Sequence, residues 1–126
     1  MRRIIIEREK VKFVGRLINY DCFLNVNKEV FEENLKRAWE NSRDGEHDED
    51  EEVISFFDNL QSIPVSNGKS ISIEIDEQQN ELFVAAGHSV SNLQTIEVGN
   101  SDVSFFIKTN YSWTKGMVII LHKNRY

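Results

Sequence analysis

The chain has 126 residues, of which 21 are acidic and 15 are basic, so its formal net charge is −6, and 40% of the residues are hydrophobic. This length and composition are typical of one globular domain, and they exclude a collagen-like repeat, a disulfide scaffold and a nucleic-acid binder held by bulk positive charge. The longest late apolar run, residues 117–121, is far shorter than the roughly 18 residues that a membrane-spanning helix needs.

The N-terminal segment predicts two strands. Residues 3–9 are short and rich in β-branched side chains, which is typical of a strand. In residues 16–26 every second side chain from Ile18 onwards is apolar, and this alternation predicts a half-buried strand. Gly15 indicates a turn or bulge between the two strands.

The spacing of apolar residues then changes to that of helices, and residues 27–62 predict a helical hairpin. Asn27 is the expected N-cap of an amphipathic helix of about four turns. A second helix is expected over residues 48–61, where Asp48 and Glu51 have the spacing of a capping box. The expected apolar faces consist of Val30, Phe31, Leu35, Ala38 and Trp39 in the first helix and of Val53, Phe56, Phe57 and Leu60 in the second.

Strand patterns return after Pro64. Isoleucines at positions 71, 73 and 75 alternate with polar residues and give the clearest strand pattern in the chain. Further strands are expected over residues 82–86, 93–98, 103–108 and 117–122, with a loop at 110–116. Short strands at this spacing are typical of an all-β sandwich or barrel.

The simplest assembly of these elements is a mainly β fold. We predict an antiparallel β-sandwich of about seven strands, with a two-helix insertion after the second strand. Residues 1–126 are expected to form a single domain, and residues 27–62 the helical insertion within it.

Negative charge is concentrated in this insertion, which carries twelve acidic and four basic residues. Seven of the nine residues 44–52 are carboxylates, but a calcium loop beginning at Asp44 would need glycine where Glu49 stands and glutamate where Ser55 stands. We therefore interpret the run as a solvated loop and first helical turn, and we expect no metal. The alternative is that it attracts a basic surface of a partner. The residues expected to contact such a partner are Glu46, Asp48, Glu49 and Asp50.

A second candidate site lies in the polar loop at 110–116. Exposed aromatic side chains can stack on sugar rings, and the end loops of sandwiches often bind ligands. A carbohydrate or another small ligand would contact Asn110, Tyr111 and Trp113. We favour the competing interpretation for Trp113, that it covers the edge of the core, because large aromatic residues are usually mostly buried.

Catalytic residues in a recognisable arrangement are not found. Cys22 could act as a nucleophile with His47, His88 or His122 as the base, but its place on the apolar face of a strand predicts burial, which raises the pKa of a thiol. The three histidines lack the spacing of a zinc site, and Gly87-His88-Ser89 does not complete a hydrolase motif. We therefore expect no enzyme and no cofactor. The single cysteine fits a reducing, cytoplasmic compartment.

The first 16 residues carry six basic side chains, partly offset by Glu7 and Glu9. This is a weak footprint for nucleic acid, and we expect neither nucleic acid nor a membrane as partner. A salt-bridged surface strand is the favoured interpretation. The alternative is that this strand meets the acidic insertion of a second copy, so the expected partner is another protein or this chain itself as a homo-oligomer.

Two stretches resemble small bacterial β-sandwich domains of unknown function, including those grouped with PEGA-type domains. One is Ile4-Ile5-Ile6-Glu7-Arg8 with Phe13-Val14-Gly15 and the strand that follows; the other is Ser66-Asn67-Gly68-Lys69-Ser70 with its alternating strand and Gly87-His88. The resemblance implies a non-catalytic sandwich and transfers no active-site residue. The insertion at 27–62 departs from that pattern. We therefore expect a non-catalytic interaction module, with a carbohydrate-binding module as the alternative.

Overall fold

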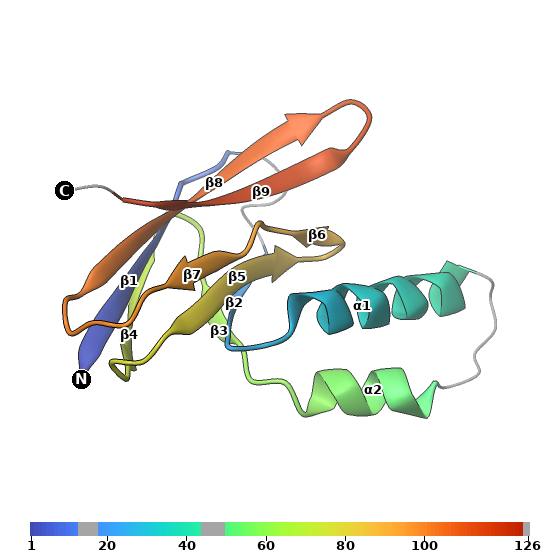
Figure 1. The fold of residues 1–126 in the computed structure, drawn as a ribbon. Helices are drawn as coiled ribbons and strands as arrows, with labels where there is room; N and C mark the ends of the chain where they lie inside the picture. The colour runs from blue at the N-terminus through green and yellow to red at the C-terminus, as the bar shows by residue number, and fades with distance from the viewer. Residues whose placement is uncertain (13–17, 44–49, 125–126) are drawn as a thin grey trace. The chain divides into compact units, whose positions relative to one another are not determined.

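The computed structural model describes residues 1–12, 18–43 and 50–124 and shows a mainly β chain with two sheets and two helices (Figure 1). It divides into two compact units. One consists of Met1–Asn25 and Ser62–Tyr126 and contains both sheets, and the other is Val26–Gln61 and contains both helices. In the described part of the chain, the helices follow the second strand, β2, as expected.

Sheet A has four strands in the order β4 (Ser70–Ile75), β1 (Arg2–Arg8), β8 (Val103–Ser112) and β9 (Gly116–Lys123). The β1 strand pairs antiparallel with β4 but parallel with β8. The prediction of an antiparallel arrangement is therefore wrong at this point. Only strands joined by a tight hairpin must be antiparallel, and the long connection between β1 and β8 lets the chain return in either direction.

Sheet B is antiparallel throughout, in the order β3 (Ile63–Val65), β2 (Tyr20–Leu24), β5 (Asn80–Ala86) and β6 (Ser89–Val90), with β7 (Gln94–Ile96) also pairing with β5. The described residues thus hold nine strands rather than about seven. The excess includes β6, because buried Ser91 interrupts what would be one strand opposite β5. Its N–H donates to the Val84 carbonyl and its hydroxyl accepts from the Val84 N–H, each at 2.8 Å.

A single hydrophobic core contains residues of both sheets. The alternation predicted for β4 is confirmed, since Ile75 is buried and Ser72 and Glu74 are exposed. In β2 it holds only in part, because Phe23 is buried next to Cys22. Ile18, expected at the start of the apolar face of β2, lies before the strand and is exposed. The fully buried core residues include Ile4, Ile6, Phe105 and Ile107 from sheet A and Tyr20, Leu82 and Val84 from sheet B.

The helices are α1 (Lys28–Arg43) and α2 (Glu51–Asp58). Asn27 is confirmed as the N-cap of α1, since its Oδ1 accepts from the Val30 N–H at 3.1 Å. The N-cap of α2 is Asp50, which accepts from the Val53 N–H, so the expected start at residue 48 is wrong. Of the helices in the described residues, neither is long and apolar enough to cross a membrane.

Three phenylalanine rings form the centre of the helical unit. The ring centroid of Phe31 in α1 lies 5.7 Å from that of Phe57 and 6.5 Å from that of Phe56, both in α2. Phe56 and Phe57 are themselves in edge-to-face contact at 5.3 Å. Aromatic pairs at these distances add to the stabilisation that burial gives, so the two helices have a packing contact of their own.

Candidate functional site

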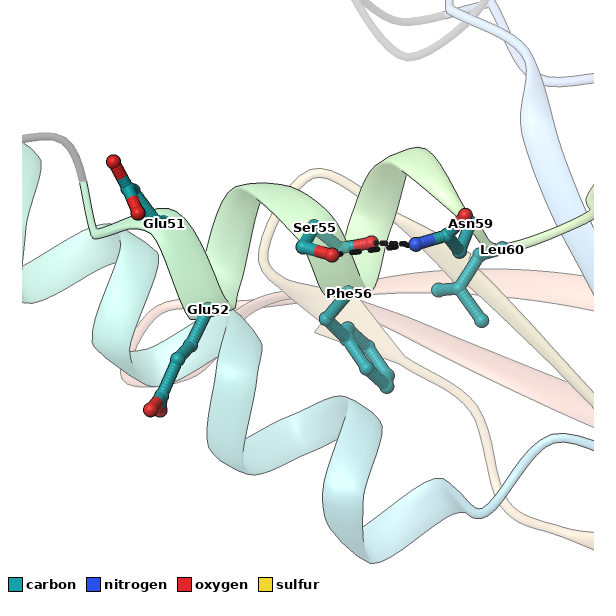
Figure 2. Close-up of a pocket in the computed structure, with 6 residues that line it drawn as sticks. All are labelled: Glu51, Glu52, Ser55, Phe56, Asn59 and Leu60. Carbon is teal, nitrogen blue, oxygen red and sulfur yellow. Dashed lines mark hydrogen bonds between the residues drawn. The ribbon is translucent and has the colours of Figure 1, made fainter.

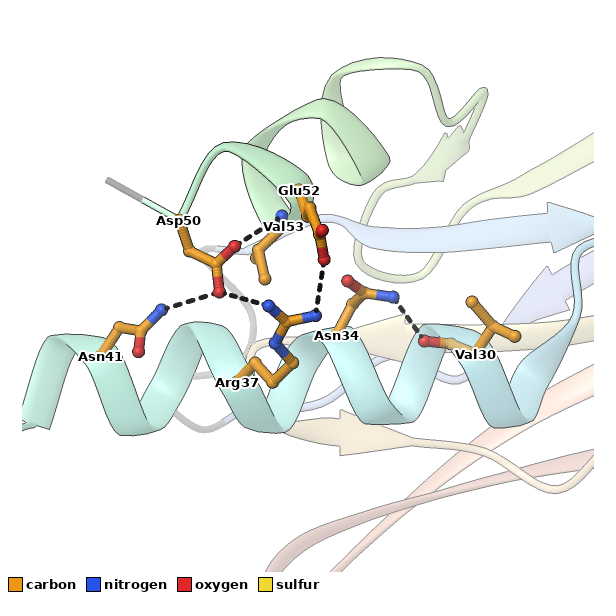
Figure 3. Close-up of polar contacts among 7 residues, drawn as sticks. All are labelled: Val30, Asn34, Arg37, Asn41, Asp50, Glu52 and Val53. Carbon is orange, nitrogen blue, oxygen red and sulfur yellow. Dashed lines mark hydrogen bonds and ion pairs between the residues drawn. The ribbon is translucent and has the colours of Figure 1, made fainter. Parts of the chain in front are cut away.

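Asp50 joins the two helices through the polar network drawn in Figure 3. Its carboxylate lies 2.7 Å from the Arg37 guanidinium of α1, which also reaches Glu52 at 3.4 Å. Desolvation acts to raise the pKa of Asp50, but the Val53 N–H and the charge of Arg37 outweigh it and the pKa is lowered. Asp50 is therefore held inside the helical unit. The other predicted partner contacts, Glu46, Asp48 and Glu49, lie outside the described residues.

An open hollow on α2 is the second feature of the helical unit (Figure 2). Phe56 and Leu60, both half-buried, form its apolar part, and the exposed carboxylates of Glu51 and Glu52 lie at its N-terminal end. Asn59 closes the C-terminal end of the helix by donating to the Ser55 carbonyl at 2.8 Å. Such a hollow can accept an apolar side chain and place a cation next to it.

The β8–β9 hairpin ends in a three-residue turn, Trp113 to Lys115, closed by the pair Ser112 and Gly116. Gly116 has a φ of +72°, the left-handed conformation that completes turns of this length. The Ser112 hydroxyl accepts from the N–H groups of Thr114 and Lys115 at 3.3 Å each. The loop expected over 110–116 is therefore a short, hydrogen-bonded turn.

Trp113 is fully exposed at this turn, with a relative accessibility of 106%. The prediction that it covers the edge of the core is wrong, because the strands on both sides continue to the turn and hold its first residue beyond the core. Tyr111 is 48% exposed and, with Ser112 and Trp113, lines an open hollow. The structure thus brings two of the three predicted ligand contacts together.

Asn110 does not join this aromatic pair. It is exposed and opposes Val118, whereas Tyr111 opposes Met117, and neighbouring residues of a strand point to opposite faces of the sheet. The Tyr111 face is anchored to sheet B, because the Tyr20 hydroxyl contacts Thr109 Oγ1 at 2.8 Å. A ligand on the aromatic pair would enter the hollow lined by Tyr111, Ser112 and Trp113, and Asn110 is not part of this lining.

The chemistry of Cys22 opposes a role as nucleophile. Its side chain is 1% exposed, and burial, assisted by the charge of Asp21, raises the pKa of its thiol to about 12. The described histidines, His88 and His122, are exposed, whereas Cys22 points into the core. Among residues 1–12, 18–43 and 50–124, no group of three His, Cys, Asp or Glu side chains could hold a metal ion.

The basic N-terminal strand differs from the expected salt-bridged surface strand. Arg2 and Arg8 alternate with Ile4 and Ile6 on the buried face of β1, whereas Arg3 is exposed and lies 3.7 Å from Glu74. Arg2 donates to the main-chain carbonyls of the turn after β4. Arg2 and Arg8 are therefore committed to the fold, which removes them from any contact with an acidic surface of a second copy. Sequence alternation alone could have indicated this burial.

Comparison with known proteins identifies no relative of this chain. No protein-family model matches it, and neither a curated protein nor a solved structure matches it significantly. Its function is therefore inferred from the residues described above.

Proposed function

We propose that this chain is a non-catalytic β-sandwich module that binds a protein partner through the helical unit, Val26–Gln61. The two sheets would be the layers of the sandwich. The hydrophobic core that contains residues of both sheets supports this arrangement. The resemblance to PEGA-type domains stays a prediction from the sequence, without a matching family model to support it. In this proposal, residues 27–62 form an insertion within a single domain.

The observation that carries this proposal is the hollow on α2, in which an apolar surface lies beside exposed carboxylates. Phe56 and Leu60 offer apolar area that a partner side chain can bury, and Glu51 and Glu52 offer negative charge. Residues 27–62 together carry an excess of eight acidic side chains, so a positively charged partner would be attracted from a distance. The expected partner surface has an apolar anchor next to lysine or arginine.

The test is affinity capture with the full chain in three forms: unchanged, Glu51→Lys combined with Leu60→Ser, and Glu97→Lys combined with Val98→Ser. Glu97 and Val98 are exposed residues of the other unit, so the second variant repeats the change in charge and polarity outside the helical unit. We expect the α2 variant to capture none of the proteins that bind the unchanged chain, and we expect the other variant to capture all of them. Equal capture by all three forms would exclude the hollow as the binding surface.

A second candidate is a carbohydrate-binding module, and the full exposure of Trp113 favours it. An exposed indole next to Tyr111 offers a face on which a sugar ring can stack. On an oligosaccharide array, binding should disappear with Trp113→Ala and persist with Trp39→Phe. Sugar binding that survives Trp113→Ala, or an array without any bound sugar, would remove this candidate.

A further inference from the structure

The two edges of sheet A differ in how their main-chain groups are satisfied. Along β9, the Asn92 side chain accepts from the Leu121 N–H at 2.8 Å, and Asn92 and Gln94 donate to the Leu121 carbonyl at 3.0 and 2.8 Å. The Ser89 hydroxyl donates to the Met117 carbonyl at 2.6 Å. Side chains thus cover this edge, whereas β4, at the other edge, has β1 as its only strand neighbour within the described residues.

The pairing of β4 with β1 determines which main-chain groups point outwards. The Arg8 N–H donates to the Lys69 carbonyl at 2.9 Å, so Lys69 faces β1. Because this direction alternates along an antiparallel pair, the main-chain groups of Ser70, Ser72 and Glu74 point away from β1. These three residues are exposed. The edge therefore presents a regular row of N–H and C=O groups.

The strand β4 itself lacks three features that often prevent edge pairing, which are proline, lysine and a bulge. Its sequence, Ser-Ile-Ser-Ile-Glu-Ile, contains no proline and no lysine, and the strand pairs with β1 without a bulge. Its one charge, Glu74, lies near Arg3 of the neighbouring strand. A six-residue edge with exposed main-chain N–H and C=O groups is a template for another strand.

We propose that β4 pairs antiparallel with β4 of a second copy, around a two-fold axis at Ser72. In this register Ile71 opposes Ile73 of the second copy on the core side, which extends the apolar face of the sheet. Glu74 opposes Ser70, so the two Glu74 side chains do not face each other. Lys69, directly before the strand, opposes Ile75, so no two like charges face each other. The strand is therefore complementary to itself, which favours a second copy over an unrelated peptide. This inference is independent of the helical unit and of the aromatic turn.

The test is Ser72→Pro, because the Ser72 N–H points outwards and its loss removes no bond to β1. By sedimentation equilibrium over a range of concentrations, the unchanged chain should show a concentration-dependent dimer and Ser72→Pro a monomer. The far-ultraviolet circular dichroism of Ser72→Pro should remain unchanged. Ser72→Thr, which keeps the N–H, is the control and should still form dimers. An unchanged chain that is monomeric at every concentration would overturn the proposal and leave a foreign strand as the occupant of the edge. Dimers that persist in folded Ser72→Pro would also overturn it.

A second measurement does not depend on how well the proline variant folds. Ser72→Cys can be labelled selectively with pyrene, since Cys22 is buried. Opposed residues of an antiparallel pair have Cα atoms about 5 Å apart, so two labels at Ser72 should give excimer fluorescence. A pyrene on Ser101→Cys, an exposed loop residue, is the control and should give monomer emission. Dimers without an excimer from position 72 would place the interface elsewhere and refute the pairing.

Discussion

The guanidinium carbon of Arg8 lies 3.6 Å from the ring centroid of Tyr20, inside the core. The Nη1 group of Arg8 donates to the carbonyls of Ile18 and Val65 at 2.8 Å each. One side chain of sheet A therefore satisfies main-chain groups of two segments, residues 18–20 and β3, and stacks on Tyr20 of the first. Burial lowers the pKa of Arg8, and the Tyr20 side chain acts in the opposite direction.

Replacing Arg8 with methionine keeps the length of the side chain but removes both hydrogen bonds. A buried group that loses its partner costs about 1–3 kcal/mol, and a desolvated cation–π contact about 2 kcal/mol, so we expect the free energy of unfolding to fall by about 3 kcal/mol. Urea unfolding measures this change. Arg3→Met, at an exposed position of the same strand, should cost less than about 1 kcal/mol. Equal losses for the two variants would contradict the role assigned to Arg8.

The thiol of Cys22 should be inert in the folded protein. At pH 8 it should react with iodoacetamide only after urea unfolds the chain, because its pKa is raised to about 12. The raised pKa also has a consequence for stability. The folded state favours the protonated thiol, so this contribution is fully present below the ordinary pKa of 9.0 and is lost as the pH rises from there towards 12. Cys22→Ala should make the free energy of unfolding less dependent on pH in this range. Rapid alkylation of the native protein would show that Cys22 is accessible.

Acid should weaken the junction between the helices. The pKa of Asp50 is lowered in the folded state, so its contribution is present above its ordinary pKa of 3.8 and is lost as the pH falls through the folded value. We expect the ellipticity at 222 nm to decrease in this range. Asp50→Asn retains a capping oxygen without the charge and should remove most of this pH dependence. Glu29→Gln, in the first turn of the other helix, should leave it unchanged. An unaltered acid transition in Asp50→Asn would mean that other carboxylates cause it.

Trp113 should behave as a tryptophan in water. In a Trp39→Phe background, its fluorescence should be maximal at a long wavelength and iodide should quench it as strongly as a free indole. Because Trp113 makes no contribution to the core, Trp113→Ala should change the free energy of unfolding by less than about 0.5 kcal/mol. A blue-shifted spectrum, or a loss of several kcal/mol, would restore the interpretation that Trp113 covers the core.

Features that depend on neighbours within a few residues could be predicted from the sequence. The alternating isoleucines of β4 and the cap at Asn27 belong to this class, since side-chain period and local hydrogen bonding determine them. Residues close in the sequence determine the start of α2 less clearly. Acidic residues are consecutive there, and contacts with Arg37 and Asn41 on the other helix favour Asp50.

Features that depend on distant residues could not be predicted in this way. The parallel pairing of β1 with β8 and the partners of Arg8 require segments far away in the chain. The position of Trp113 was missed for a different reason. The general tendency of tryptophan to be buried was overridden by a short turn, of which Gly116 was the signal.

The position of β1 between β4 and β8 affects how the chain folds during synthesis. Ribosomes release the N-terminus first, so β1 emerges long before β8, its parallel neighbour, has been translated. Ile4 and Ile6 can therefore meet Ile73 and Ile71 of β4 first, whereas Val103 and Phe105, their partners in β8, are made later. Sheet A can close only after β8 and β9 have been translated, and such pairing of strands that are distant in the chain is slow.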